Sequence, residues 1–271
     1  GDVYKRQLYA FLKYPELRLH REDWRITRRD VTRHLIQGIP LGLQFSVLAI
    51  GIIVMQSVIV QFDTLGGEMV SNAAQNGFGA ANKLNNLLMT PLNGLGAAMT
   101  SFTAQNLGAG DHARIKKGTV QALIIVWTMC LISIAAGLLL SRGGGYLYIF
   151  LSPDKVTAET MRYGNTYLYV DLSLYLFLGF IFVVRNCVQG IGKPQFVLGA
   201  GAAELAARVS VCLLLPPLIA GGAVNSDAPR AAVYALCFAD PFAWMAADAV
   251  LLVPFLRNIM KMDYRYLKGT M

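Results

Sequence analysis

The chain has 271 residues, of which 55% are hydrophobic and only 15% are charged. Soluble domains are about 25% charged, so this composition excludes an ordinary water-soluble globule. The net charge of +8 does not indicate nucleic-acid binding, because that would require a basic face on a soluble module, whereas most basic residues here lie between long apolar segments. We predict an all-α integral membrane protein.

The first segment, residues 1–31, is strongly basic and precedes the apolar part of the chain. Residues 5–33 hold nine lysines and arginines mixed with four acidic residues, which favours a position on the cytoplasmic face of the membrane. The chain begins with Gly1 instead of methionine and shows no signal peptide. We therefore expect a truncated chain, and residues 1–7 have no pattern that marks them as native.

Six apolar segments follow, separated by polar and glycine-rich breaks. A helix rises 1.5 Å per residue, so about 20 apolar residues cross the ~30 Å hydrocarbon core of a bilayer. Each segment reaches that length, which predicts a bundle of six transmembrane helices within residues 32–260 and a basic cytoplasmic tail at 261–271. The expected spans are about 32–61, 71–107, 113–141, 156–189, 195–220 and 230–260.

The first two predicted spans each contain an internal proline, Pro40 and Pro91. Proline removes a backbone donor and weakens the helix at that point. We predict hinge-like bends at both residues.

With these six predicted spans, the lysines and arginines are distributed unequally between the two sides of the membrane. If the N-terminal segment is cytoplasmic, 18 of the 24 lysines and arginines, Arg185 and Lys193 among them, fall on inner segments. Four fall on outer segments, and Lys83 and Arg208 lie inside helices. Cytoplasmic loops of membrane proteins carry the excess of lysine and arginine. The distribution supports six helices with both ends in the cytoplasm.

Ionisable residues inside membrane helices are costly, and they usually face protein or a watery cavity. Glu204 and Arg208 are spaced i,i+4 and share one helix face, so they either form a structural salt bridge or line a cavity. We hypothesise that Glu204 faces a central cavity and binds a cation or a cationic drug. Further candidates for a substrate or cation site are Lys83, Asp171, Asp248 and Gln44.

Other polar residues are expected to have structural roles. Asp240 precedes Pro241 and is predicted to satisfy freed backbone donors. The four cysteines lie singly in apolar segments without metal-binding spacing, so we predict neither a metal site nor a cofactor. No GxxxxGK[ST], HExxH or GxSxG motif occurs, which argues against ATP hydrolysis and against an enzyme.

Four stretches form a recognisable series: GIPLGLQ at 38–44, the segment from ANKLNN to RIKKG at 81–118, VVRNCVQGIGKP at 183–194 and PFAWMAAD at 241–248. Together they resemble the carboxy-terminal half of multidrug and toxic compound extrusion (MATE) transporters. The resemblance extends from about residue 14 to residue 261. The QNLGAG and RNCVQGIGKP motifs are its most specific parts.

This resemblance implies two six-helix lobes around a central cavity that opens alternately to each side of the membrane, driven by Na⁺ or H⁺. The chain would be the second lobe, with residues 1–31 linking it to the missing amino-terminal lobe. Some family members carry cation-binding carboxylates at positions that are Leu48 and Leu178 or Gly179 here. The choice between Na⁺ and H⁺ is therefore open.

The function that the resemblance implies is secondary active efflux by cation antiport in the plasma membrane of a prokaryote. The expected partners are a cationic, amphipathic small molecule and the lipid bilayer. One alternative is a lipid-linked sugar flippase of the same superfamily, whose cavity should be lined by many basic residues. Others are a non-transporting membrane scaffold and a membrane enzyme.

Overall fold

The computed structural model describes residues 2–15 and 25–261, which are almost entirely helical apart from one short hairpin. The chain divides into two units, Gly1–Ile39 and Pro40–Met271. Each unit is compact in its own right, and the long helix α2 (Arg28–Gln61) begins in the first unit and continues into the second.

The first unit holds α1 (Asp2–Lys13), an amphipathic helix, and the start of α2. Thr27 and Asp30 fix that start. The Asp30 backbone N–H donates to Thr27 Oγ1 at 3.3 Å, and the Thr27 backbone N–H donates to Asp30 Oδ2 at 3.1 Å. This reciprocal pair has the arrangement of a capping box, which satisfies backbone donors that a helix start leaves open.

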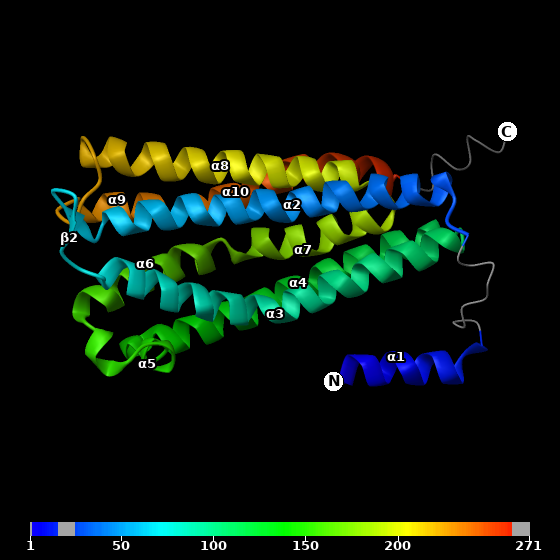
Figure 1. Cartoon of the computed structure of the whole chain (residues 1–271), viewed down its shortest axis with the longest axis horizontal. Helices are drawn as coiled ribbons and strands as arrows, with labels where there is room; N and C mark the ends of the chain where they lie inside the picture. The colour runs from blue at the N-terminus through cyan, green and yellow to red at the C-terminus, as the bar shows by residue number, and fades with distance from the viewer. Residues whose placement is uncertain (1, 16–24, 262–271) are drawn as a thin grey trace. The chain divides into compact units, whose positions relative to one another are not determined.

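The second unit is a bundle of long helices that run along one axis (Figure 1). A hairpin of β1 (Thr64–Leu65) and β2 (Glu68–Met69) joins α2 to α3 (Ala73–Gly108). The remaining elements are α4 (His112–Ser141), η3 (Arg142–Gly144), α5 (Leu147–Phe150), η4 (Pro153–Lys155), α6 (Ala158–Ser173), α7 (Tyr175–Gly190), α8 (Pro194–Ala220), α9 (Arg230–Cys237), α10 (Ala239–Pro254) and the π-helical turn η5 (Phe255–Met260).

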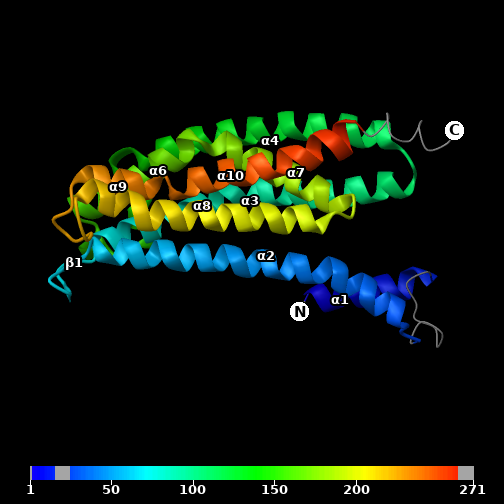
Figure 2. The ribbon, with the colours of Figure 1, turned by 90° about the horizontal axis from the view of Figure 1, so that it is seen from above.

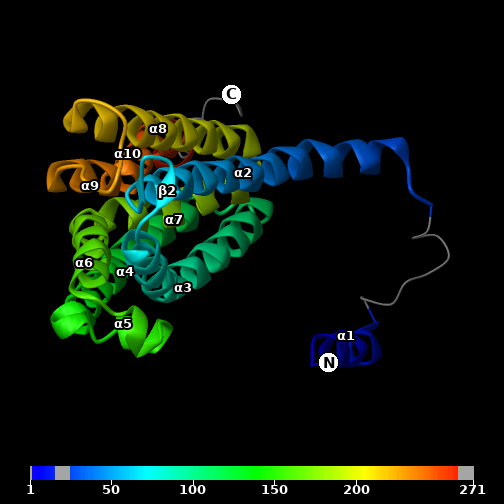
Figure 3. The same cartoon turned by 60° about the vertical axis from the view of Figure 1, so that its left-hand side comes forward.

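Two groups of helices make up this unit, and α7 lies between them (Figure 3). One group is α3, α4 and α6, and the other is α8, α9 and α10. Helix α7 packs against α3 and α4 on one side and against α10 on the other. The part of α2 from Pro40 onward runs along one side of the bundle, near α8, while α4 lies on the opposite side (Figure 2).

Four helical segments in the described residues are long and apolar enough to cross a membrane, and the bent pair α6–α7 raises the number to five. Helix α3 has the length, at 36 residues, but is not among them, because the asparagines and Lys83 along it lower its mean hydropathy. The predicted all-α membrane bundle is confirmed, and the predicted count of six spans is approximate.

The predicted span at 156–189 is divided into α6 and α7, which are bent by 57° at Leu174. No proline or glycine marks the break, so the apolar pattern runs across it. A side chain of α4 supports the α7 side of the break, since Trp127 Nε1 donates to the Leu176 carbonyl at 3.2 Å. Asp171, in the last turn of α6, therefore lies next to a discontinuity in the helix.

The last predicted span is also divided, at Phe238, between α9 and α10. Pro241 accounts for this break, because it lacks an N–H group and its ring crowds the carbonyl of Cys237 four residues earlier. By contrast, α2 and α3 continue through Pro40 and Pro91. Hinge motion at these two prolines stays a prediction.

Close packing between α3 and α6 depends on a glycine. A Cβ atom at Gly77 would lie 2.4 Å from the backbone oxygen of Thr160, and small residues at such contacts let helix backbones approach in lipid. We expect Gly77→Ala to lower the free energy of unfolding by about 1–3 kcal/mol, measured by thermal unfolding in detergent. Gly79→Ala is the matched control on the same helix, because nothing lies within 4 Å of its Cβ position. Equal effects of the two substitutions would contradict the packing argument.

Candidate functional site

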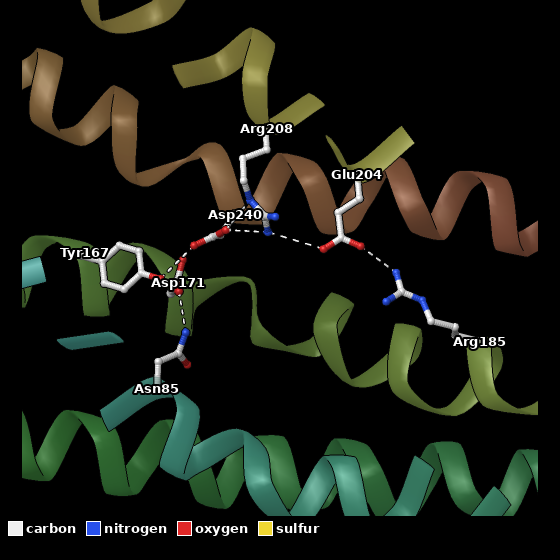
Figure 4. A network of polar contacts seen from close by, with 7 residues as sticks. All are labelled: Asn85, Tyr167, Asp171, Arg185, Glu204, Arg208 and Asp240. Atoms are coloured by element: carbon white, nitrogen blue, oxygen red, sulfur yellow. Dashed lines mark hydrogen bonds and ion pairs between the residues drawn. The ribbon is translucent and has the colours of Figure 1, made fainter. Parts of the chain in front are cut away.

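A chain of polar side chains runs through the middle of the second unit, and we call it the polar network (Figure 4). Helices α3, α6, α7, α8 and α10 each contribute to it. Polar groups removed from water need partners, so these contacts also fix how the helices pack. The members of the network are Asn85, Tyr167, Asp171, Arg185, Glu204, Arg208 and Asp240.

Arg208 of α8 is the centre of the polar network and is only 5% exposed. Its Nε donates to Asp240 Oδ1 at 2.8 Å, and its Nη2 lies 2.7 Å from the same oxygen and 3.4 Å from Glu204 Oε1. Glu204 Oε2 accepts a shorter hydrogen bond, 2.7 Å, from Arg185 Nη2 of α7. Glu204 therefore lies between two guanidinium groups, and these four charges hold α7, α8 and α10 together.

Asp171 lies at the other end of the polar network, where it takes part in no ion pair among the described residues. It is completely buried, and its Oδ2 accepts a 2.8 Å hydrogen bond from Asn85 Nδ2 of α3. Its Oδ1 has no hydrogen-bond partner, and neither has Asn85 Oδ1. Tyr167 connects this end to the rest, because its hydroxyl donates to Asp240 Oδ2 at 2.8 Å.

The charges of the polar network do not balance. It contains three carboxylates and two guanidinium groups, so it carries one uncompensated negative charge when all five groups are ionised. Since Glu204 and Asp240 are both paired with arginine, the excess charge belongs to Asp171.

The polar network forms one wall of a cavity of about 430 Å³, and an adjoining cavity of about 600 Å³ shares Tyr167 and Asp240 in its lining. Both volumes fall in the range of ~300–1,000 Å³ that is typical of ligand sites. Helix α2 provides apolar side chains, among them Leu41, Phe45 and Leu48. The amide side chains that line the first cavity are Gln44, Asn82, Asn85, Asn86, Asn93, Asn186 and Gln189.

Four of the six predicted site residues come together here. Glu204, Arg208 and Asp171 belong to the polar network, and the predicted contact between Glu204 and Arg208 is present. Gln44 lines the first cavity, and its Oε1 is buried without a partner. The hypothesis that Glu204 faces a cavity agrees with this placement, although both of its oxygens are already engaged by arginine.

The other two predicted residues lie outside the polar network. Lys83 of α3 is exposed and lines the second cavity, where its Nζ is 6.0 Å from the ring centroid of Phe150. Asp248 of α10 lines neither cavity and borders a separate groove with apolar walls.

Two network residues have other roles in the structure than the sequence predicts. Arg185 is expected in a cytoplasmic turn, but it lies in α7, more than a turn before the helix ends at Gly190. It shares a helix face with the buried Leu178 and Ile181, seven and four residues earlier, and that periodicity is the signal that could have located it. Asp240 pairs with arginine instead of backbone donors, because a charge-assisted hydrogen bond is the stronger one.

Membrane-length helices around a cavity with buried charges and amides define a membrane transporter as the class of protein. The chain belongs to the MatE family, whose sequence profile matches residues 35–214. The predicted resemblance to MATE transporters is thereby confirmed.

One curated relative is the probable multidrug resistance protein YpnP of Bacillus subtilis (strain 168), which is 30% identical over 174 residues. That match covers 59% of this chain and 33% of the relative. The chain therefore spans about a third of the curated relative it matches.

Two solved structures share the fold. A crystal structure of MATE in complex with MaL6 is 17% identical with a TM-score of 0.70, and the match covers 94% of this chain and 54% of that one. The outward-facing conformation of a multidrug resistance MATE family transporter of the MOP superfamily is 16% identical with a TM-score of 0.71, covering 94% of this chain and 53% of that one. The chain thus spans about half the length of these transporters, and at such identities the likeness shows the fold alone.

Proposed function

We propose that this chain is the carboxy-terminal six-helix lobe of a secondary active exporter, and that the complete protein extrudes cationic amphipathic compounds in exchange for Na⁺ or H⁺. Both ends of the chain would lie in the cytoplasm of a prokaryote. The observation that carries the proposal is Asp171, a fully buried carboxylate without a cationic partner among the described residues. Its neighbours Asn85 and Tyr167 line a cavity of ligand size.

The position that we propose for the coupling ion is beside Asp171. Asp171 Oδ1 and Asn85 Oδ1 are two buried acceptors that lack a donor. A proton on the Asp171 carboxyl group would supply a donor, and a Na⁺ beside Asp171 would take the carboxylate oxygen as a ligand. Either cation also neutralises the excess charge of the polar network. The polar network is neutral when the cation is bound and carries one negative charge when the cation has left. If the two charge states favour different conformations of the lobe, an ion gradient can drive the lobe between them.

The lining of the cavity supports a cationic amphipathic substrate. The apolar face of α2 suits a hydrophobic body, and the amides opposite it suit polar groups. The charged side chains in the lining, two arginines and two carboxylates, are paired with one another, so no unpaired cation in the lining repels such a substrate. The name of the Bacillus relative, a probable multidrug resistance protein, agrees with such a substrate.

The main alternative, a lipid-linked sugar flippase, predicts a basic cavity. Arg185 and Arg208 both line the first cavity. The structure therefore supports this alternative more than the sequence alone does. Both arginines are paired with carboxylates, however, so neither is available to bind an anionic lipid carrier. The cavity therefore favours organic cations over anionic lipid carriers.

Separate ion gradients test the proposed exchange. The complete protein that contains this chain would be reconstituted in proteoliposomes and given a Na⁺ gradient or a pH gradient. We expect a fluorescent lipophilic cation such as ethidium to move against its concentration under one of them and to remain in equilibrium without a gradient. Movement under neither gradient would contradict ion-coupled export. The 271-residue chain alone is expected to be inactive, and export by it would refute the two-lobe part of the proposal.

A further inference from the structure

A third hollow is lined by residues of α4, α7 and α10, and we call it the outer groove. In the ribbon, α4 lies on the side of the bundle opposite α2 (Figure 2). The volume of the outer groove is about 590 Å³. Trp127, Phe177 and Leu252 on its walls are 40%, 38% and 44% exposed, so the groove opens to the outside of the bundle. Its lining residues, none of which lines the two cavities beside the polar network, are Trp127, Leu176, Phe177, Phe180, Met245, Asp248, Ala249 and Leu252.

Asp248 is the one ionisable residue in this lining. Its Oδ1 is buried without a hydrogen-bond partner, and Asp248 takes part in none of the ion pairs of the described residues. An acidic side chain inside a membrane helix is costly and normally has a partner. The lining of the groove holds no cation, and the two charged groups that act on Asp248 from behind it, Arg185 and Glu204, are already paired with each other. The carboxylate can therefore receive a cation from outside.

Aromatic rings stand on the walls around this carboxylate. Trp127 Nε1 already donates to the Leu176 carbonyl at 3.2 Å, which fixes the indole and leaves its ring as the part that can interact. Phe180 is held by an edge-to-face contact with Phe255, with ring centroids 5.6 Å apart. Aromatic faces attract organic cations, so rings and a carboxylate in one apolar groove are the combination that recognises an alkylammonium or arylammonium group.

We propose that the outer groove binds one amphipathic amine taken from the surrounding bilayer. Its ammonium group would pair with Asp248 and the aromatic rings, and its apolar part would lie along Leu252 and Met245. The exposed apolar rim makes lipid the source, because a hydrophobic amine reaches this rim without crossing water. The site is distinct from the cavity of the proposed function, since the two share no lining residue and binding here requires no ion gradient.

Photolabelling tests this site in membranes from cells that express the protein. The probe is an alkyltrimethylammonium with a diazirine in its chain, and the control probe is the matching uncharged alcohol. We expect the cation to label peptides that contain Trp127, Phe177 or Met245 roughly tenfold more strongly than the alcohol. Asp248→Asn should remove that excess, and Asp248→Glu, which keeps the charge, should retain it. Asp171→Asn should leave it unchanged, so that failure of the proposed transport and failure of this site are distinguishable.

Three results would overturn the proposal. The first is equal labelling of the groove by the cation and the alcohol. The second is cation-selective labelling that survives in Asp248→Asn. The third is absence of labelling at Trp127 by a diazirine phospholipid, which would show that protein, and not lipid, covers the groove. The unfolding temperatures of Asp248→Asn and Asp248→Glu control for misfolding. If Asp248→Asn unfolds at a lower temperature than the parent, the Asp248→Glu result and the comparison of the two probes decide whether the groove binds the cation.

Discussion

Arg208→Ala is expected to destabilise the protein by about 3–5 kcal/mol, the largest loss of stability that we predict for a single substitution. Arg208 is 5% exposed and contacts both Asp240 and Glu204. Removing its guanidinium leaves Asp240 as a largely buried carboxylate, 13% exposed, with only the Tyr167 hydroxyl as a partner. A carboxylate in this position must become protonated, become hydrated or move. Each of these changes weakens the packing of α8 against α10. Equilibrium unfolding in mixed detergent micelles measures the loss.

A matched control and a rescue separate this effect from a general loss of arginine. Arg162 forms an exposed pair with Glu159, with side chains 41% and 62% exposed, so Arg162→Ala should change stability by less than about 1 kcal/mol. The double variant Arg208→Met with Asp240→Asn removes one charge of each sign and leaves Glu204 paired with Arg185. It should recover most of the lost stability. No recovery would mean that Arg208 acts by shape and not by charge.

The helix boundaries that the sequence predicts well are those set by local chemistry. The prediction 113–141 agrees with α4 to one residue, because Asp111 caps that helix by accepting from the Arg114 N–H at 2.9 Å. The prediction 195–220 agrees with α8 to one residue, because Gly221 ends the helix at φ 72°. The bend at Leu174 has no such local signal, since contacts from another helix support it.

The same distinction explains which site residues were predictable. Glu204 and Arg208 are four residues apart on one helix, so their contact follows from helical geometry alone. Arg185 and Glu204 are 19 positions apart, and Asn85 and Asp171 are 86 apart. These pairs arise only when α7 meets α8 and when α3 meets α6, which a single sequence does not specify. The sequence therefore indicates which charges are buried, but not which of them lacks a partner.

Asp171→Asn is expected to abolish gradient-driven export while leaving the protein folded, which is the largest functional effect that we predict. Asparagine has almost the same shape as aspartate but carries no charge and cannot exchange a proton. Its oxygen can still accept from Asn85 Nδ2, so the contact between α3 and α6 is kept. The variant therefore resembles the lobe with its coupling ion bound. Because an ion gradient drives transport only through a group that releases the ion, this lobe should be held in one state.

Three measurements on the complete protein make this prediction specific. Asp171→Asn should bind the fluorescent cation with an affinity within about threefold of the parent, since Asp171 does not line the cavity and makes no contact with a ligand there. Its export under either gradient should fall at least about tenfold, which corresponds to a change of 1.4 kcal/mol or more in the driven step. Asp227→Asn, in an exposed loop, should export normally.

The pattern of these results matters more than any single value. Lost export with intact binding and folding assigns ion coupling to Asp171. Lost binding together with lost export would instead make Asp171 part of the substrate site, because the charge would then attract the substrate directly. Undiminished export in Asp171→Asn would show that the uncompensated carboxylate only positions Asn85 and that coupling depends on another acid. Each outcome changes a different part of the proposal, because the substitution keeps the shape of the side chain while it removes the charge and the ability to release an ion.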